Sequence, residues 1–315
     1  MTAPAATHWA ALGETTCVGG IRFLCAIERW LGRWPFRLCL APVVLLHWLG
    51  NGTARRASRE YLQRLHASHR VFARAPGRWL SLRHFALFAE TLLDKLLASH
   101  GRYPAARVQV QREAMLEQMA RGEGGVIVTA HIGCLELCQA LADQVPGFRL
   151  TALVHTAHAE DFNRLLARLN PQAQVRLLQV TELDVATACL LGQRVAAGEF
   201  VAIAGDRVPV HGGRCVTTPF LGRPAAFPVG PYVLAAALGC PLFAMACTHA
   251  GNGYQLRFER MCERVHLPRA RRQAALHAHV RDYAAWLERQ VLAAPLDWFN
   301  FFPFWEQGHD DRKTR

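Results

Sequence analysis

Lysine and serine are scarce in this chain of 315 residues. The only lysines are Lys95 and Lys313, so nearly all of the positive charge is arginine. Serine occupies four positions: Ser58, Ser68, Ser81 and Ser99. None of them lies in a Gly-x-Ser-x-Gly elbow, which disfavours serine hydrolase chemistry.

Signatures of cofactors and metals are missing as well. The chain has no Walker loop and no Gly-x-Gly-x-x-Gly dinucleotide fingerprint. None of its ten cysteines forms a Cys-x-x-Cys pair, and most lie in apolar sequence, which indicates reduced, buried thiols. His155 and His158 have a spacing that suits a metal, as do His131, Cys134 and Cys138, but no fourth ligand is indicated. We therefore expect neither a cofactor nor a metal.

The charge balance restricts the partners. With 36 basic and 24 acidic residues the formal net charge is +12, which fits nucleic acid, an anionic membrane surface, or an acidic protein or substrate. The basic residues are scattered, and their densest group covers residues 269–272. No nucleic-acid-binding module and no stripe of aromatic and basic residues is present, so nucleic acid is disfavoured as a partner.

An apolar run near the start predicts membrane contact. Phe36–Leu49 is shorter than the ~20 residues that span a bilayer. Tryptophans and arginines surround it, which is typical of a helix lying in a membrane interface. A helical hairpin buried against the main domain is the alternative, and we expect no signal peptide. The side chains concerned are Trp30, Trp34, Trp48, Arg33, Arg37, Arg55 and Arg56.

Predicted helices give way to alternating strands and helices after residue 111. Strands are expected at Val126–Thr129, Leu150–Val154, Val175–Val180, Phe200–Ala204, Leu242–Cys247 and Tyr254–Glu259. Helices are expected at Ala54–Ala73, Leu80–Ser99, Arg112–Ala120, Cys134–Asp143, Ala159–Leu169, Asp184–Ala197, Gly230–Leu238 and Arg269–Leu292. The pattern predicts an α/β fold with a mostly parallel central sheet flanked by helices. We place a helical, membrane-associating N-terminal cap at residues 1–100 and the α/β domain at residues 101–315.

The most informative feature is a histidine that follows a strand. The chain runs Gly124-Gly-Val-Ile-Val-Thr-Ala-His131-Ile-Gly-Cys-Leu-Glu136. His131 and Glu136 therefore arrive together at the carboxyl end of a strand, where α/β sheets bind ligands. A carboxylate can orient a histidine ring and stabilise its charged form, so we interpret the pair as a proton-abstracting dyad. The alternative is a helix-capping histidine with a glutamate at the start of a helix.

Two further segments accompany this pair. Asp206 and Arg207 end another predicted strand and should lie at the same edge of the sheet; a turn aspartate beside a solvent arginine is the alternative. Thr218–Pro231 combines prolines and glycines with Phe220 and Phe227, which indicates either a shaped apolar loop or an ordinary structural loop. Without a nucleophile, cofactor or metal, a histidine–carboxylate pair most naturally deprotonates a substrate hydroxyl or amine.

In this order, the motifs resemble the bacterial lysophospholipid acyltransferase superfamily, in its lipid A late acyltransferase branch. His131 and Glu136 match the family's His-x4-Asp/Glu motif, and Asp206-Arg207 matches a later strand that ends in Asp-Arg or Asp-Gln. Phe220-Leu-Gly222 and Pro228-Val-Gly-Pro231 match a following Phe-Leu-Gly…Pro-x-Gly-Pro segment. The resemblance covers nearly the whole chain, from about residue 9 to residue 305.

Two segments depart from the lipid A enzymes. Leu153–His158 stands where those enzymes have an arginine-containing segment. The ending Trp298–Trp305 is more similar to acyltransferases of aryl polyene and related pigment-lipid pathways. These departures concern the identity of the acceptor and leave acyl transfer as the expected reaction.

The resemblance implies an acyltransferase at the cytoplasmic face of the bacterial inner membrane. His131 would act as general base on a hydroxyl of a lipid or glycolipid acceptor, supported by Glu136. The donor would be an acyl thioester on the phosphopantetheine of acyl carrier protein, or acyl-CoA, as a co-substrate. Backbone amides near Gly133, with Arg207, would bind phosphate or the developing oxyanion, and the apolar loop would hold the acyl chain. The expected substrate-binding residues are Gly133, Asp206, Arg207, Phe220 and Gly222.

One function of another class stays open beside acyl transfer. A non-catalytic lipid-binding or acyl-carrier-binding protein on the same scaffold would need only the basic surface and the apolar N-terminal region. The presence of both His131 and Glu136 argues against it.

Overall fold

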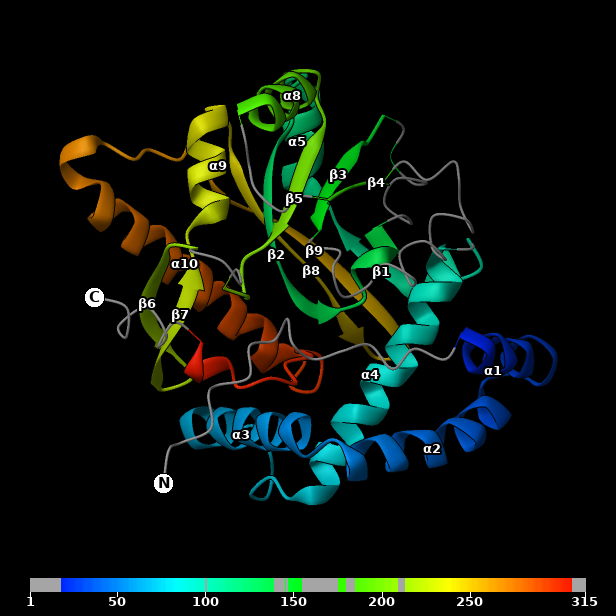
Figure 1. Ribbon diagram of the computed structural model, residues 1–315. Coiled ribbons are helices and arrows are strands. Elements are labelled where there is room, and N and C mark those ends of the chain that lie inside the picture. Colours follow the sequence, from blue (N-terminus) through cyan, green and yellow to red (C-terminus); the bar gives the residue numbers. More distant parts are fainter. Residues whose placement is uncertain are drawn as a thin grey trace.

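A seven-stranded sheet forms the centre of the part of the chain that the computed structural model describes, namely residues 18–99, 101–138, 145, 147–154, 175–179, 185–208 and 213–307. Its strand order is β1-β9-β8-β2-β5-β3-β4 (Figure 1). The strands are β1 (Val108–Gln111), β2 (Gly125–Gly133), β3 (Leu150–Val154), β4 (Val175–Gln179), β5 (Phe200–Ala204), β8 (Leu242–Ala250) and β9 (Gly253–Cys262). All neighbours are parallel except β8 and β9, which confirms the predicted fold class.

Helices cover both faces of this sheet. They are α1 (Val18–Leu31), α2 (Arg33–Gly50), α3 (Gly52–His69), α4 (Arg78–Ser99), α5 (Glu113–Ala120), α8 (Val185–Ala196), α9 (Gly230–Leu238) and α10 (Arg272–Ala293). On β2, Val126 and Val128 face a core shared with α3, α9 and α10, whereas Ile127 faces a core shared with α2, α4 and α5. Because both faces are buried, the strand is a nearly continuous apolar run rather than an alternating one.

Most described elements agree with the sequence pattern, with shifts at their ends. β3, β5 and α9 have the predicted bounds. The sequence does not predict β1, because its four residues, Val-Gln-Val-Gln, are too few to establish a period. The predicted helix Ala159–Leu169, the second half of the predicted helix Cys134–Asp143, and both His155 and His158 lie outside the described residues; the described first half contains a short 3-10 helix at Leu135–Leu137.

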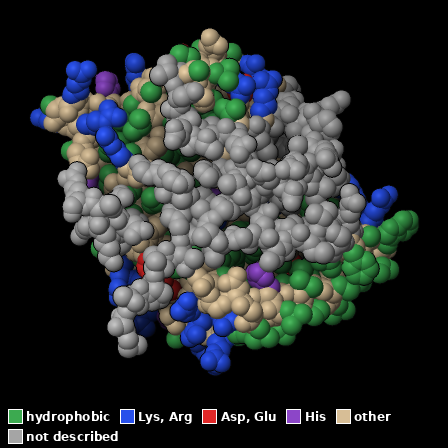
Figure 2. Space-filling model, in the orientation of Figure 1, with side chains coloured by type: hydrophobic (Ala, Val, Ile, Leu, Met, Phe, Trp, Pro, Cys, Tyr) green, Lys and Arg blue, Asp and Glu red, His purple; other side chains and the backbone are tan. Residues whose placement is uncertain are grey.

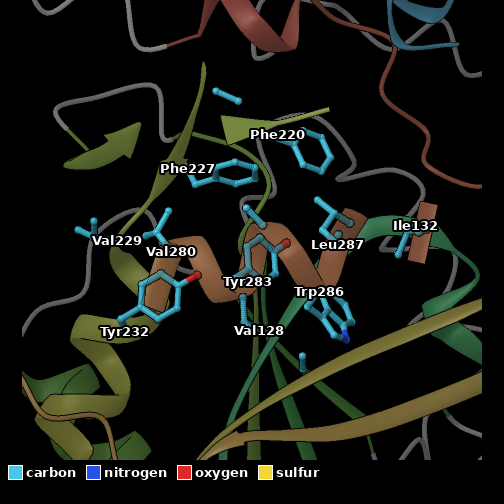
Figure 3. Close-up of a cluster of buried hydrophobic side chains, with 14 of the residues drawn as sticks. Val128, Ile132, Phe220, Phe227, Val229, Tyr232, Val280, Tyr283, Trp286 and Leu287 are labelled. Atoms are coloured by element: carbon cyan, nitrogen blue, oxygen red, sulfur yellow. The ribbon is translucent and has the colours of Figure 1, made fainter. Parts of the chain in front are cut away.

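The segment Thr218–Pro231 is not the exposed apolar loop that its prolines suggest. It contains the antiparallel hairpin of β6 (Cys215–Phe220) and β7 (Arg223–Pro228). The two-residue turn, Leu221-Gly222, has φ values of 48° and 76°. A type I′ hairpin turn requires such positive φ values at both positions. Phe220 and Phe227 contact each other edge to face and are fully buried against α10 (Figure 3). They are core residues, and the expectation that this segment holds the acyl chain stays a prediction.

The four N-terminal helices form the predicted helical region and pack on the sheet through α2 and α4 on one face and α3 on the other. Helix α2 buries Phe36, Leu40 and Val44 on one side. In the part of the chain that the structure describes, no helix is both long and apolar enough to cross a bilayer. The other side of α2, together with α1, exposes large apolar side chains (Figure 2): Phe23, Trp30, Leu31, Trp34, Leu38, Val43, Leu45, Leu46 and Leu49.

The burial of Phe220 predicts a large effect on stability. We expect Phe220→Ala to lower the free energy of unfolding by ~3–5 kcal/mol, because a fully buried ring is replaced by a cavity. Urea denaturation of the purified protein measures this. Phe23→Ala is the matched control, since its ring is 64% exposed, and should change the value by no more than ~0.5 kcal/mol. Equal losses in both variants would contradict the placement of Phe220 in the core.

Candidate active site

β2 ends in a bulge that carries His131. Thr129 pairs with Met245 and Gly133 pairs with Cys247, so three residues of β2 lie opposite one residue of β8. Bulges of this kind redirect side chains and are common beside active sites. The His131 side chain, in the middle of the bulge, is 38% exposed, whereas its two neighbours in the bulge are buried.

The carboxylate that holds the His131 ring is Asp206, not Glu136. Asp206 Oδ1 lies 2.8 Å from Nδ1 of the ring, and Oδ2 accepts the backbone N–H of His131 at 2.9 Å. Oδ2 also accepts the indole N–H of Trp298 at 3.0 Å. Asp206 is 3% exposed, so these donors replace the water that it has lost. The prediction that Asp206 and His131 meet at one edge of the sheet is confirmed.

These contacts fix the protonation of the pair. Burial alone would raise the pKa of Asp206, but the charges of His131 and Arg207 and the hydrogen bonds from His131 lower it to about 2. Asp206 is therefore ionised and can only accept, so Nδ1 carries the proton. Burial and the charge of Arg207 lower the pKa of His131, against the opposing effect of Asp206. At pH 7 the ring is neutral, with its lone pair on Nε2.

Glu136 lies in a separate ion pair. Its Oε1 is 3.0 Å from Nζ of Lys95 on α4, and its Oε2 is 3.8 Å from the thiol sulfur of Cys134. Burial, the largest single effect, would lower the pKa of Lys95, but the charge and hydrogen bond of Glu136 together with the coulombic effect of Cys134 give a net upward shift. The protonated Lys95 in turn lowers the pKa of His131. The described contact of Glu136 is therefore with Lys95, whereas that of the imidazole is with Asp206.

Gly133 shapes the bulge. Its φ is +59°, and a Cβ there would lie 1.8 Å from the carbonyl oxygen of Cys247, so only glycine fits. Its N–H donates to the carbonyl of Asp297, and the next amide, that of Cys134, donates to Cys247, both at 2.9 Å. Because both amides are engaged, the expected oxyanion role of the amides near Gly133 is not supported.

Arg207 places a second cation at this edge. Its guanidinium carbon lies 5.4 Å from the centre of the Phe302 ring. Burial lowers the pKa of Arg207 and Asp206 opposes that shift, but an arginine stays charged at neutral pH. Its charge also lowers the pKa of His131.

Residues 297–299 complete the site, although no sequence motif pointed to them. Ile132 and Trp298 form an antiparallel bridge, and the N–H of Phe299 donates to the carbonyl of His131 at 3.0 Å. The segment therefore runs along the bulge as a short additional strand. The aromatic ending Trp298–Trp305 was the only feature of the sequence that drew attention to this segment. It does not indicate that the segment contacts His131.

A second histidine–aspartate pair lies on the neighbouring strand. β8 runs parallel to β2 and carries His249 near its end. Asp297, which is 2% exposed, accepts the backbone N–H of His249 and lies 3.0 Å from its ring Nδ1. This geometry repeats that of His131 and Asp206, and the sequence offered no motif that predicts it.

A buried hydrogen-bond network holds the main chain of Trp298. Burial lowers the pKa of His84 on α4 to about 4, against the hydrogen bond to Trp298, so its ring is neutral. Nε2 of His84 donates to the Trp298 carbonyl, and Nδ1 accepts from Ser58, both at 3.0 Å. Ser58 also bonds Ser81, which accepts the indole N–H of Trp48 at 3.2 Å. Helices α2, α3 and α4 are thereby connected to the segment that closes the site.

One protein family matches this chain. Its model, described as bacterial lipid A biosynthesis acyltransferase, covers residues 89–307, from within α4 to the end of the aromatic segment. None of the curated proteins compared with the chain matches it. The family match confirms the resemblance to the lipid A branch, while the likeness of residues 298–305 to pigment-pathway acyltransferases stays a prediction.

The pairing of His131 with Asp206 predicts a measurable pKa change. Asp206→Asn should lower the pKa of His131 further, by about one unit, because it removes the negative charge that stabilises the imidazolium. An NMR titration of the ring measures this. Glu136→Gln is the comparison and should change the value less, since Glu136 lies in an ion pair with Lys95 and Asp206 is the carboxylate that contacts the ring. A larger shift in Glu136→Gln would restore Glu136 as the partner of the ring.

Proposed function

Because the chain belongs to the bacterial lipid A biosynthesis acyltransferase family, we propose that His131 is the general base for transfer of an acyl chain to a lipid hydroxyl. The observation that carries this proposal is the contact of Asp206 with Nδ1 of His131, 2.8 Å long, which leaves Nε2 unprotonated. The ring lies at the carboxyl end of parallel strands, where substrates bind in such sheets.

In the proposed reaction, Nε2 of His131 takes the proton of the acceptor hydroxyl while the oxygen attacks the carbonyl carbon of an acyl thioester. The C–O bond forms, the C–S bond breaks, and the imidazolium gives its proton to the departing thiolate. Asp206 keeps the ring in the required tautomer and stabilises its charged form. Lys95, held by Glu136, and Arg207 supply positive charge where the oxyanion develops.

For the donor we propose a thioester on an acidic acyl carrier protein, with acyl-CoA as the alternative. The formal net charge of +12 supports this choice, because a basic surface steers an acidic partner toward it. The family match supports a lipid-type acceptor. The rates of thiol release from the two donors, compared over a range of salt concentrations, distinguish them, since steering weakens as salt rises.

The mechanism predicts different behaviour for the two carboxylates. His131→Ala should abolish thiol release from acyl carrier protein thioester in the presence of membrane lipid, while the variant stays folded. Asp206→Asn should lower kcat by roughly 10²–10⁴-fold. It should also move the acid limb of the pH profile to lower pH, because the pKa of His131 falls. Glu136→Gln should lower kcat and move that limb less. Full activity of His131→Ala would overturn the assignment of the base.

We also propose that α1 and α2 bind the membrane surface. Members of the family are membrane-associated in general. The exposed apolar side chains of these helices lie next to arginines, a combination that favours an anionic lipid interface. Trp34 is 72% exposed and Leu38 is 66% exposed, although burial in lipid would stabilise both.

Vesicle binding tests this surface. Trp34→Ser and Leu38→Ser should each weaken cosedimentation with vesicles of anionic phospholipid by roughly tenfold, because each removes apolar area that enters the interface. Leu116→Ser and Leu190→Ser are the controls, since they alter exposed leucines (41% and 40%) that lie on α5 and α8. Equal loss of binding in the controls would contradict the assignment of α1 and α2.

A further inference from the structure

We propose that Trp298 is a positioning residue that sets the basicity of His131 through Asp206. The inference rests on the proposed function, in which His131 is the base. It assigns a role to the indole N–H of Trp298, which donates to Oδ2 of Asp206 at 3.0 Å in a buried environment.

The Trp298 indole is held so that it cannot turn away from Asp206. The residue is 1% exposed. Its main chain is fixed by the bridge to Ile132 and by the hydrogen bond from His84 to its carbonyl. Its ring is packed edge to face, at centroid distances of 5.0, 5.4 and 4.8 Å, against Tyr61, Phe220 and Phe304.

The position of this donor determines its effect on the base. Oδ1 of Asp206 faces Nδ1 of His131, while Oδ2 faces the indole and the backbone N–H of His131. An N–H that points at a carboxylate places partial positive charge there and weakens the negative potential felt by the imidazole. The indole therefore keeps the ring less basic than Asp206 alone would make it. Hydrogen bonds to ionised acceptors are strong in buried sites, so the effect is large enough to measure.

Substitution of Trp298 leaves the charged residues around His131 in place. They are Asp206 and Arg207, which follow β5, and Lys95 on α4, which is paired with Glu136. A Trp298→Phe substitution changes none of them, and it keeps an aromatic ring in the cluster. A change in the titration of His131 in that variant therefore reports the lost indole donor.

Trp305 provides a matched control. It is also buried, and it packs on the Phe220 and Phe304 side chains that surround Trp298. Its indole nitrogen is buried and has no hydrogen-bond partner among the described residues. Trp305→Phe therefore removes the same atoms from the same cluster without removing a donor from Asp206.

The experiment compares the pH dependence of kcat/KM in Trp298→Phe and Trp305→Phe. Trp298→Phe should raise the acid limb by about half a unit and lower kcat roughly tenfold with KM unchanged. Trp305→Phe should leave the acid limb in place. In the Asp206→Asn background, Trp298→Phe should have little further effect, because its target is gone. Coincident pH profiles of the two single variants, or full additivity with Asp206→Asn, would overturn the inference.

A measurement on the unaltered protein keeps the test decisive if Trp298→Phe fails to fold. The indole proton resonance of Trp298 should shift with pH along the titration of His131, whereas that of Trp305 should not; no shift in Trp298 overturns the inference. If His131→Ala is fully active, the proposed function fails and this titration still decides the role of Trp298. If His131→Ala is inactive and the indole does not respond, only the role of Trp298 fails.

Discussion

The site depends on the hydrogen bonds that the buried carboxylate of Asp206 accepts. This carboxylate sits where β5 ends, and its three N–H contacts come from the bulge of β2 and from residues 297–299. A buried carboxylate with fewer donors would become protonated or draw in water, and the bulge would lose its anchor. One charge therefore holds three distant segments together and at the same time fixes the proton on the histidine ring.

The second pair, His249 with Asp297, shows that this solution is used twice. In both pairs a buried aspartate accepts the backbone N–H and faces the ring Nδ1 of a histidine at the end of a parallel strand. Asp297 and Trp298 are adjacent, so one short segment serves both histidines. The C-terminal aromatic segment is thus a structural part of the catalytic edge rather than an appendage to the sheet.

Sequence patterns predicted the sheet, because buried parallel strands such as β2 and β5 are apolar runs that end in polar residues. They failed at the hairpin of Phe220 and Phe227, because the prolines in its two strands are typical of a loop. They also placed His131 and Asp206 at one edge but gave the histidine the wrong carboxylate. Sequence patterns favour partners that are close in the chain, such as Glu136. Asp206, the partner in the structure, is 75 positions away from His131, and their contact depends on a bulge that no periodicity reveals.

The scarcity of lysine has a chemical consequence at the edge of the sheet that carries His131. Acyl thioesters react with free amines, and Lys95 is the only lysine among the described residues. Its ion pair with Glu136 and the coulombic effect of Cys134 raise its pKa against the effect of burial, so the nitrogen keeps its proton and has no lone pair to offer. Arginine, which carries nearly all the other positive charge, does not deprotonate. In the proposed reaction, a thioester bound here would meet cations without nucleophilic amines among the described residues, which would protect the protein from acylating itself.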